Sequence, residues 1–272
     1  ISKIQLKRKD GSVIFEYETE NNSVKKTLEA YINRERKRED EFVNLQHINL
    51  HGTDLREIDL SWVNLKYADL SYSKLSKASL YCANLEYANL RFSDLTEADL
   101  RYADLRKTNL RCDDLSYANI EGANLSGADL SETNLYNANL KNTKLIDANL
   151  RETNLSNADL KYTDLINTNL TSADLSYADL SYSNLTSADL SYAYLSGVNL
   201  SNADLKDAEL GGANLSNAIL NSTKNIKYAT CSFDGHGERG RQLLAIKINN
   251  ETMLFCGCFK GNEAELRKYI EE

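Results

Sequence analysis

Residues 68–90 read ADLSY SKLSK ASLYC ANLEY ANL, and the spacing of leucine in this stretch decides the fold. Leu occupies every fifth position from Leu45 to Leu220, with Ile120 as the one exception, which gives 36 consecutive units of five residues. Two residues before each of these positions stands a small or apolar residue, Ala in 20 units, and one residue before it stands Asn in 16 units or Asp in 14. The phase never shifts, so one structural unit is repeated along most of the chain.

A period of five fits neither a straight helix nor a flat strand. In an α-helix five residues advance about 500°, so successive Leu side chains would spiral around every face. In a strand they would alternate between the two faces of the sheet. One buried column of Leu therefore requires the chain to turn between units. If four units form the four sides of a coil, the 36 units form nine coils, which stack about 4.8 Å apart into a rod roughly 43 Å long.

The units resemble those of the pentapeptide-repeat family, whose motif is Ala-(Asp/Asn)-Leu-X-X, and the flanking segments resemble those of its bacterial or phage members. The resemblance covers residues 43–222, with units such as Ala123-Asn124-Leu125 and Ala188-Asp189-Leu190. It implies an all-β solenoid, a right-handed quadrilateral β-helix of about nine coils. We expect the Asn and Asp side chains to bond nearby backbone groups at the corners and to tolerate unusual φ angles there.

The open ends of such a rod need caps, because unpaired backbone groups are exposed there. Residues 1–42 predict an N-terminal cap: a hairpin from Lys3 to Lys9 and Ser12 to Tyr17, and a helix beginning at Ser23. The helix places its apolar residues on one face, which we expect to lie on the first coil. These residues are Val24, Leu28, Tyr31 and Ile32.

Residues 223–272 predict a C-terminal cap built on the same plan. After a loop, Arg241 to Ile248 and Met253 to Phe259 alternate as the two strands of a hairpin. Asn262, with Glu265 three residues later, predicts the start of a final helix. The chain is thus divided into a cap, a rod and a second cap.

One inward column of the rod is polar where the others are mostly Ala. Residues 20 apart share a column, and this column contains Ser93, Asp113 and Thr133. Asp113 is the only charged residue at an inward position, and an unpaired buried carboxylate is costly. We predict an internal polar ladder in which the hydroxyl groups of Ser93 and Thr133 donate to Asp113.

Three motifs suggest a cofactor or metal site, but each lacks a neighbouring element or ligand that such a site requires. Gly235 to Gly240 matches a dinucleotide-binding glycine pattern, but a strand pattern follows it where a helix is required, which leaves a loop or an anion site using Arg239 and Arg241. Cys256 and Cys258 lack the second pair that a zinc site needs. His47 and His51 lack further ligands. We therefore expect no enzyme, no metal and no cofactor.

The outward positions after each Leu carry aromatic and basic residues in the first half of the rod. Tyr, Trp and Arg are enriched at the energetic centres of protein interfaces. Simple stacking between coils would account for the same columns. The possible interaction surface consists of Trp62, Tyr67, Tyr72, Tyr87, Phe92, Tyr102, Arg91 and Arg111.

The charge is acidic, with 40 acidic against 32 basic residues and a net charge of −8. This argues against direct binding of nucleic acid. No apolar stretch is long enough for a membrane span, the charged start predicts no signal peptide, and the sparse cysteines indicate a reducing, cytoplasmic location.

The resemblance leaves two functions open. The first is a non-catalytic, rigid scaffold for an unknown protein partner, acting as a monomer or weak dimer. The second is mimicry of DNA toward DNA gyrase or another DNA-binding protein, as some members of the family do. Residues 43–222 carry 24 acidic and 14 basic side chains, whereas duplex DNA of that length carries roughly 25 charges. The scaffold is therefore favoured.

Overall fold

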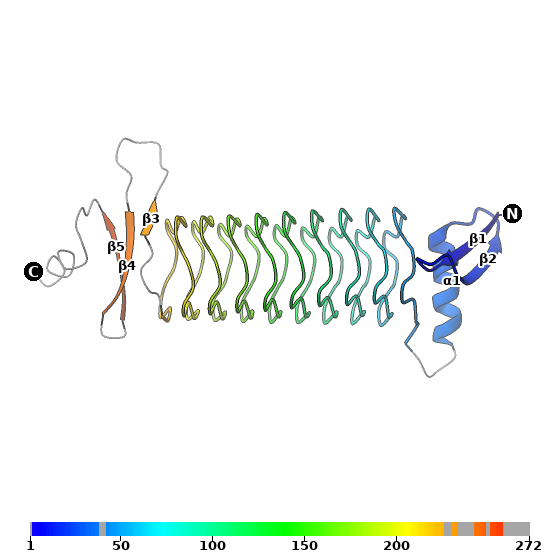
Figure 1. Cartoon of the computed structure of the whole chain (residues 1–272), viewed down its shortest axis with the longest axis horizontal. Coiled ribbons are helices and arrows are strands. Elements are labelled where there is room, and N and C mark those ends of the chain that lie inside the picture. The colour runs from blue at the N-terminus through cyan, green and yellow to red at the C-terminus, as the bar shows by residue number, and fades with distance from the viewer. Residues whose placement is uncertain (1, 38–41, 226–229, 233–241, 249–250, 258–272) are drawn as a thin grey trace, which may run out of the picture.

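A rod of stacked coils forms most of the protein, with a hairpin and a helix at its amino-terminal end and three strands at the other (Figure 1). The computed structural model describes residues 2–37, 42–225, 230–232, 242–248 and 251–257, the last three ranges as strands without their side chains. Each unit of the rod contributes one side of a coil. The fold is the expected right-handed quadrilateral β-helix.

Parallel β-bridges join each coil to the next. They connect residues 20 apart, from Asn44 with Asn64 through to Asp204 with Lys224. Four units of five residues therefore complete one coil. The bridging residue of every unit is the one before Leu, which is the middle of each straight side.

The backbone hydrogen bonds of one unit explain the motif. The N–H groups of Leu65 and Tyr67 donate to carbonyl groups of the next coil, and those of the two residues after Tyr67 donate to the Leu65 carbonyl in the turn and to the preceding coil. The remaining N–H, that of Lys66, donates to Oδ1 of Asn64 at 3.2 Å. A buried or half-buried N–H without a partner is costly. The Asn or Asp before Leu therefore supplies the one acceptor that the backbone lacks.

The corners differ from the sequence-based expectation in one respect. The left-handed residue of each turn lies two positions after Leu, and φ there is between 53° and 71° from His47 to Ser222. None of the Asn or Asp residues before Leu has a positive φ among the described residues. The prediction that these Asn and Asp residues tolerate unusual φ angles was wrong. They lie on the straight side of the coil, from which their side chains accept a hydrogen bond from the turn. The residue that needs φ > 0 is the third residue of the turn, two positions after Leu.

The core is a set of continuous columns. Leu side chains of the rod are almost completely buried, and the Ala side chains two positions earlier fill the space between neighbouring Leu columns. The small residue is required because two side chains from each of four sides point into one narrow interior.

The amino-terminal cap closes the first coil. Strands β1 (Ser2–Lys7) and β2 (Val13–Thr19) form an antiparallel hairpin, and helix α1 (Val24–Arg36) follows with Ser23 as its N-cap. The end of β1 and the residues after it pair with the rod, since Asn49 N donates to the Lys7 carbonyl and Lys9 N donates to the His47 carbonyl, both at 2.8 Å. Leu28 and Ile32 of α1 are buried in the common core. The expected hairpin and helix are thus present.

Beyond the rod, β3 (Thr230–Ser232), β4 (Gln242–Ile248) and β5 (Glu251–Gly257) form an antiparallel sheet in the order β3-β4-β5. The predicted hairpin corresponds to β4 and β5, while β3 was not expected. The final helix predicted from Asn262 lies outside the described residues. In the part of the chain that is described, no helix has the length and apolarity of a membrane span.

Candidate protein-interaction surface

Aromatic side chains on the corner positions form ladders along the rod. The two residues after Leu point outward, and each stacks over the residue 20 positions later because the coils are in register. A side chain at a left-handed φ costs about 1 to 2 kcal/mol. Except in the last described units, the corner N–H offsets part of this cost with a bond to the next coil, as Tyr72 N does to the Arg91 carbonyl at 3.0 Å.

The first ladder consists of His47, Tyr67, Tyr87 and Lys107. The ring centroids of His47 and Tyr67 are 4.9 Å apart, and those of Tyr67 and Tyr87 are 5.2 Å apart, both in stacked geometry. Lys107 continues the column, with Nζ 3.1 Å from the Tyr87 hydroxyl. The vertical stacking expected from the sequence is therefore present.

The second ladder lies on the next corner. Tyr72 and Phe92 have ring centroids 5.0 Å apart, and the guanidinium of Arg91 lies 4.5 Å from the centre of the Phe92 ring. His51 meets the edge of Tyr72 and is also within 2.9 Å of the Ser71 hydroxyl. Stacking does not bury these rings, because Tyr72 is 55% and Phe92 39% exposed.

The third ladder includes a residue that the sequence did not single out. Trp62 and Tyr102 are two coils apart, and Tyr81 contacts both of them edge to face at 5.8 Å. The Arg101 guanidinium lies 5.4 Å from the Tyr81 ring. Tyr81 was missed because it is one residue after Leu and therefore belongs to another column, although its ring reaches across.

Six of the eight predicted residues flank a single side of the rod. This side consists of the stacked segments 67–72, 87–92 and 107–112, with Tyr67 and Tyr87 on one corner and Tyr72 and Phe92 on the other. Arg91 and Arg111 lie on the side itself, next to the second corner. We call these three segments the arginine face. Trp62 and Tyr102 lie on a different corner, so the structure separates them from the other six.

The arginine face is positively charged in an acidic protein. Its three segments contain Arg91, Lys107 and Arg111 against one carboxylate, Asp69. Arg111 pairs with Glu132 of the next coil at 2.5 Å, whereas none of the ion pairs among the described residues involves Arg91. The Arg91 guanidinium therefore packs on the Phe92 ring and is accessible to a partner.

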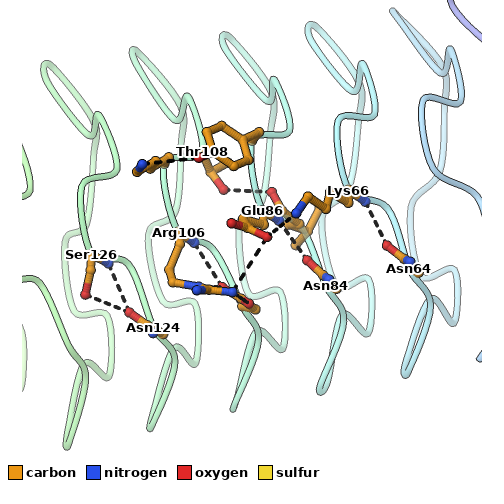
Figure 2. A network of polar contacts seen from close by, with 12 residues as sticks. Asn64, Lys66, Asn84, Glu86, Arg106, Thr108, Asn124 and Ser126 are labelled. Atoms are coloured by element: carbon orange, nitrogen blue, oxygen red, sulfur yellow. Dashed lines mark hydrogen bonds and ion pairs between the residues drawn. The ribbon is translucent and has the colours of Figure 1, made fainter.

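The side preceding the arginine face carries a charged network across three coils. The network consists of Lys66, Glu86 and Arg106 (Figure 2). The Oε2 atom of Glu86 is 2.6 Å from Nζ of Lys66 and 3.6 Å from the guanidinium of Arg106. Hydrogen bonding to Glu86 raises the pKa of Lys66. Lys66 also lies 5.2 Å and 5.6 Å from the Tyr67 and Tyr87 ring centres. The network therefore holds the Lys66 ammonium group against the Tyr67 and Tyr87 rings of the first ladder.

The internal polar ladder differs from the prediction. Asp113 is buried, and its Oδ1 accepts the Ser93 N–H at 2.8 Å, but neither its Oδ2 nor the Ser93 hydroxyl has a hydrogen-bond partner within the described part of the chain. Thr133 donates instead to the Leu110 carbonyl at 2.7 Å. The prediction was wrong because a Thr hydroxyl in this column reaches a carbonyl of the preceding coil. Burial raises the pKa of Asp113 to about 8.

The outward carboxylates serve first as acceptors for the turns. Asp129 Oδ1, for example, accepts the N–H of Ser131 at 3.1 Å and the side-chain amide of Asn149 in the next coil at 3.0 Å. A bidentate bond from Arg56 lowers the pKa of Asp54 to about 2. Much of the acidity is thus neutralised or interrupted locally, which limits any continuous resemblance to a phosphate backbone.

The other chemical candidates gain no support. Among the described residues no group of three or more His, Cys, Asp or Glu side chains could hold a metal ion. His47 and His51 are engaged with Tyr67 and with Tyr72 and Ser71, respectively. The loop from Gly235 to Gly240 and Cys258 lie outside the described residues, as does the side chain of Cys256.

The comparisons place this architecture among known proteins. HetL from the cyanobacterium Nostoc sp. strain PCC 7120, involved in heterocyst differentiation regulation, is 32% identical over 71% of this chain and 95% of its own, with a TM-score of 0.40. Rfr23 from the cyanobacterium Cyanothece 51142 is 40% identical over 35% of this chain and 63% of its own, with a TM-score of 0.28.

A more distant similarity is to QnrB1, a plasmid-mediated fluoroquinolone resistance protein. It is 15% identical over 69% of this chain and 93% of its own, with a TM-score of 0.36. No curated protein matches the chain. The family model for pentapeptide repeats (8 copies) matches residues 44–80, 82–111, 114–151, 148–186 and 183–221. Since these matches span well over half of its length, the chain belongs to the pentapeptide-repeat family.

Proposed function

We propose that the protein is a non-catalytic, rigid scaffold that binds a protein partner through the arginine face. The observation that carries this proposal is the combination of exposed rings on both corners with an arginine that has no acidic partner among the described ion pairs. Rings held by stacking lose little conformational entropy on binding, which favours affinity. Aromatic and arginine side chains provide most of the energy at protein interfaces.

The rod supports this role mechanically. Nearly all of its interior is Leu and Ala, and each unit is bonded to both neighbouring coils. A solenoid of this kind presents side chains at fixed spacing on a surface that can vary without changing the core. Binding through it would require no rearrangement of the backbone.

The test is capture of partners from a bacterial lysate by the full chain, compared with a variant carrying Tyr67→Ser, Tyr87→Ser and Phe92→Ser. Ser occupies the same corner position at Ser172 and Ser187, so the turns should persist. The matched control is Tyr162→Ser with Tyr182→Ser, which removes another stacked pair with a centroid distance of 5.1 Å. We expect the first variant alone to lose the partner, with unchanged circular dichroism.

DNA mimicry toward gyrase is the second candidate, and the acidity of the later coils favours it. Residues 159–222 contain eight acidic side chains against Lys161 and Lys206. Binding of that kind would be released by moderate salt and would depend on these carboxylates, because electrostatic association is screened. A partner that survives the salt wash and is lost in the Tyr67/Tyr87/Phe92 variant supports the scaffold. A partner released by salt and retained by that variant contradicts it.

A further inference from the structure

A second surface, on the later coils, has a composition unlike the rest of the rod. It consists of the stacked segments 113–117, 133–137, 153–157, 173–177, 193–197 and 213–217, which we call the serine face. It contains no Lys or Arg, and its only outward carboxylates are Asp114 and Asp174. The remaining outward positions are Ser, Asn, Tyr or Gly. Charged residues are depleted at the centre of protein interfaces, and antibody binding loops show that Tyr, Ser, Gly and Asn together can form a binding surface.

Tyr194 departs from the repeat in a way that the fold does not require. It occupies the position before Leu where 30 of the 36 units have Asn or Asp. On the same face, Asn154 Oδ1 accepts the Ser156 N–H at 3.1 Å, and Asn214 Oδ1 accepts the Ser216 N–H at 3.0 Å. A Tyr side chain cannot accept this bond, and the Tyr194 ring is 57% exposed. The turn therefore loses its acceptor and gains an exposed ring.

Two further tyrosines are held flat beside Tyr194. The Tyr177 ring lies against Gly197, where a Cβ atom would be only 2.7 Å from two ring carbons, and the Tyr192 ring lies against Gly212 in the same way. Both rings remain exposed, at 67% and 68%. The glycines leave space for both rings to lie along the rod. Tyr177 belongs to the serine face, and Tyr192 lies on the corner column that borders it, which also contains Glu132 and Glu152. The serine face therefore has exposed rings both within it and at its edge.

We propose that the serine face binds a second copy of this chain, side by side. Two copies with a net charge of −8 repel each other, and the repulsion between contacting groups is smallest where charged side chains are scarce. A second copy also has the same spacing between coils, so the side-chain positions on the two faces are matched along the whole contact. An unrelated partner would match this period only by chance. If the two copies are related by a two-fold axis, each uses its own serine face, and the assembly ends at a dimer.

The area of the serine face predicts a weak association. Six coils at about 4.8 Å and a side of five residues give a contact of roughly 29 by 16 Å, or about 900 Å² counted over both copies. Stable complexes bury about 1,200 Å² or more, so a dissociation constant in the micromolar range is expected. This proposal does not depend on the proposed role of the arginine face, which lies on the neighbouring side of the rod and meets the serine face only at residues 112 and 113.

The experiment is sedimentation velocity of the full chain over about 1 to 200 µM, the range in which a weak dimer is populated. The test variant is Tyr194→Asn, which restores the repeat motif, so its melting temperature should be equal or higher. The control is Tyr182→Asn, at a corner on another side where Asn142 and Asn202 already occupy the same column. We expect Tyr194→Asn to weaken dimerisation by about tenfold or more and Tyr182→Asn to leave it unchanged.

Added salt should leave the dimer intact or strengthen it, because screening reduces the repulsion between two acidic copies. Three results would overturn the proposal. The first is a chain that stays monomeric throughout this range, as would follow if its own carboxyl-terminal segment covered the serine face. The second is an equal loss in both variants. The third is a dimer that dissociates in salt, which would indicate contact between charged surfaces instead.

Discussion

The Tyr102 ring lies directly against the backbone of Gly122 in the next coil. A Cβ atom at position 122 would be 2.6 Å from Cε1 of Tyr102 and 2.7 Å from its Cδ1. Gly122 has φ +68°, close to the values of the other corner residues, most of which are not Gly. The absent side chain of Gly122 therefore leaves the space that the Tyr102 ring occupies in this orientation.

We predict that Gly122→Ala destabilises the rod more than Gly52→Ala does. Both positions have a left-handed φ, but nothing lies within 4 Å of a Cβ atom at position 52. The two variants share the backbone cost, and only the first displaces the Tyr102 ring, which is 56% exposed and can turn away, so the added cost should be about 1 kcal/mol. Thermal denaturation followed by circular dichroism measures the difference. Equal melting temperatures would show that the ring moves aside without cost.

The sequence predicts the rod well because its period requires a turn in every unit and its motif resembles a family with a four-sided coil. Leu at every fifth position requires a turn in every unit, and the columns of rings at Tyr67 and Tyr87 or at Tyr72 and Phe92 follow from a coil of 20 residues. The left-handed corner could also have been found, since Gly52, Gly122, Gly127, Gly197 and Gly212 all stand two residues after Leu or Ile. Glycine marks that position because it accepts φ > 0 without cost.

The 20-residue period assigns each side chain to a column, but it does not determine the direction in which that side chain points. Thr133 is in the predicted column, yet its hydroxyl bonds a carbonyl of the preceding coil. Tyr81 is outside the predicted columns, yet its ring contacts Trp62 and Tyr102. Both outcomes depend on rotamers chosen by local contacts, which a repeat period does not specify. The division of the eight surface residues between corners follows from the 20-residue coil, whereas the direction of each ring does not, and their role in binding stays a prediction.

The network around Glu86 provides a test of surface electrostatics. Glu86 lies between Lys66 and Arg106, so Glu86→Gln would leave two cations close together without the carboxylate that pairs with both. We expect the melting temperature to fall by a few degrees at low salt and to approach that of the unmodified protein in about 1 M salt, where the repulsion is screened.

The control for this test is Glu97→Gln. Glu97 is 3.7 Å from Lys77, both side chains are more than half exposed, and such pairs contribute little. A fall of equal size in both variants, or one that salt does not reduce, would contradict an electrostatic role for Glu86.

Asn residues that separate Asp residues in a column should stabilise the fold as well as lower the charge. The column of Asp114, Asn134, Asn154 and Asp174 is an example. Asn134 Nδ2 donates to Asp114 in the preceding coil at 3.1 Å, and Asn134 Oδ1 accepts the Asn154 side-chain amide at 3.0 Å. Asn134→Asp removes the first donor and stacks two carboxylates. We expect a lower melting temperature at pH 7, with most of the loss recovered near pH 4, where the new repulsion is relieved by protonation.

Asp159 and Asp179 indicate how the rod tolerates such a stack. They occupy successive coils, and Lys161 Nζ is 3.9 Å from one carboxylate and 3.1 Å from the other. Adding a lysine at the equivalent position, Ser116→Lys in the Asn134→Asp background, should therefore restore part of the stability at pH 7. No recovery would imply that the lost amide bonds, and not the charge, cause the effect.

Asp113 makes the stability of the rod depend on pH in the neutral range. Its pKa is raised to about 8 in the folded protein from an ordinary value of 3.8 because the carboxyl group is buried. The folded state therefore retains a proton that the unfolded state releases above about pH 4. The free energy of unfolding should fall as pH rises from about 4 to about 8, by an amount on the order of 5 kcal/mol, and then level off.

Replacement of this carboxyl group should remove the dependence. Asp113→Asn keeps the shape but cannot ionise, so it should match the unmodified protein at pH 5 and exceed its melting temperature at pH 8.5. Asp113→Thr should behave likewise, since Thr133 and Thr153 in the same column each donate to a Leu carbonyl of the preceding coil. Asp114→Asn, a neighbouring surface substitution, serves as the control. If the unmodified protein were equally stable at pH 5 and pH 8.5, Asp113 would have to be ionised with little cost, through bonds that its Oδ2 lacks in this structure.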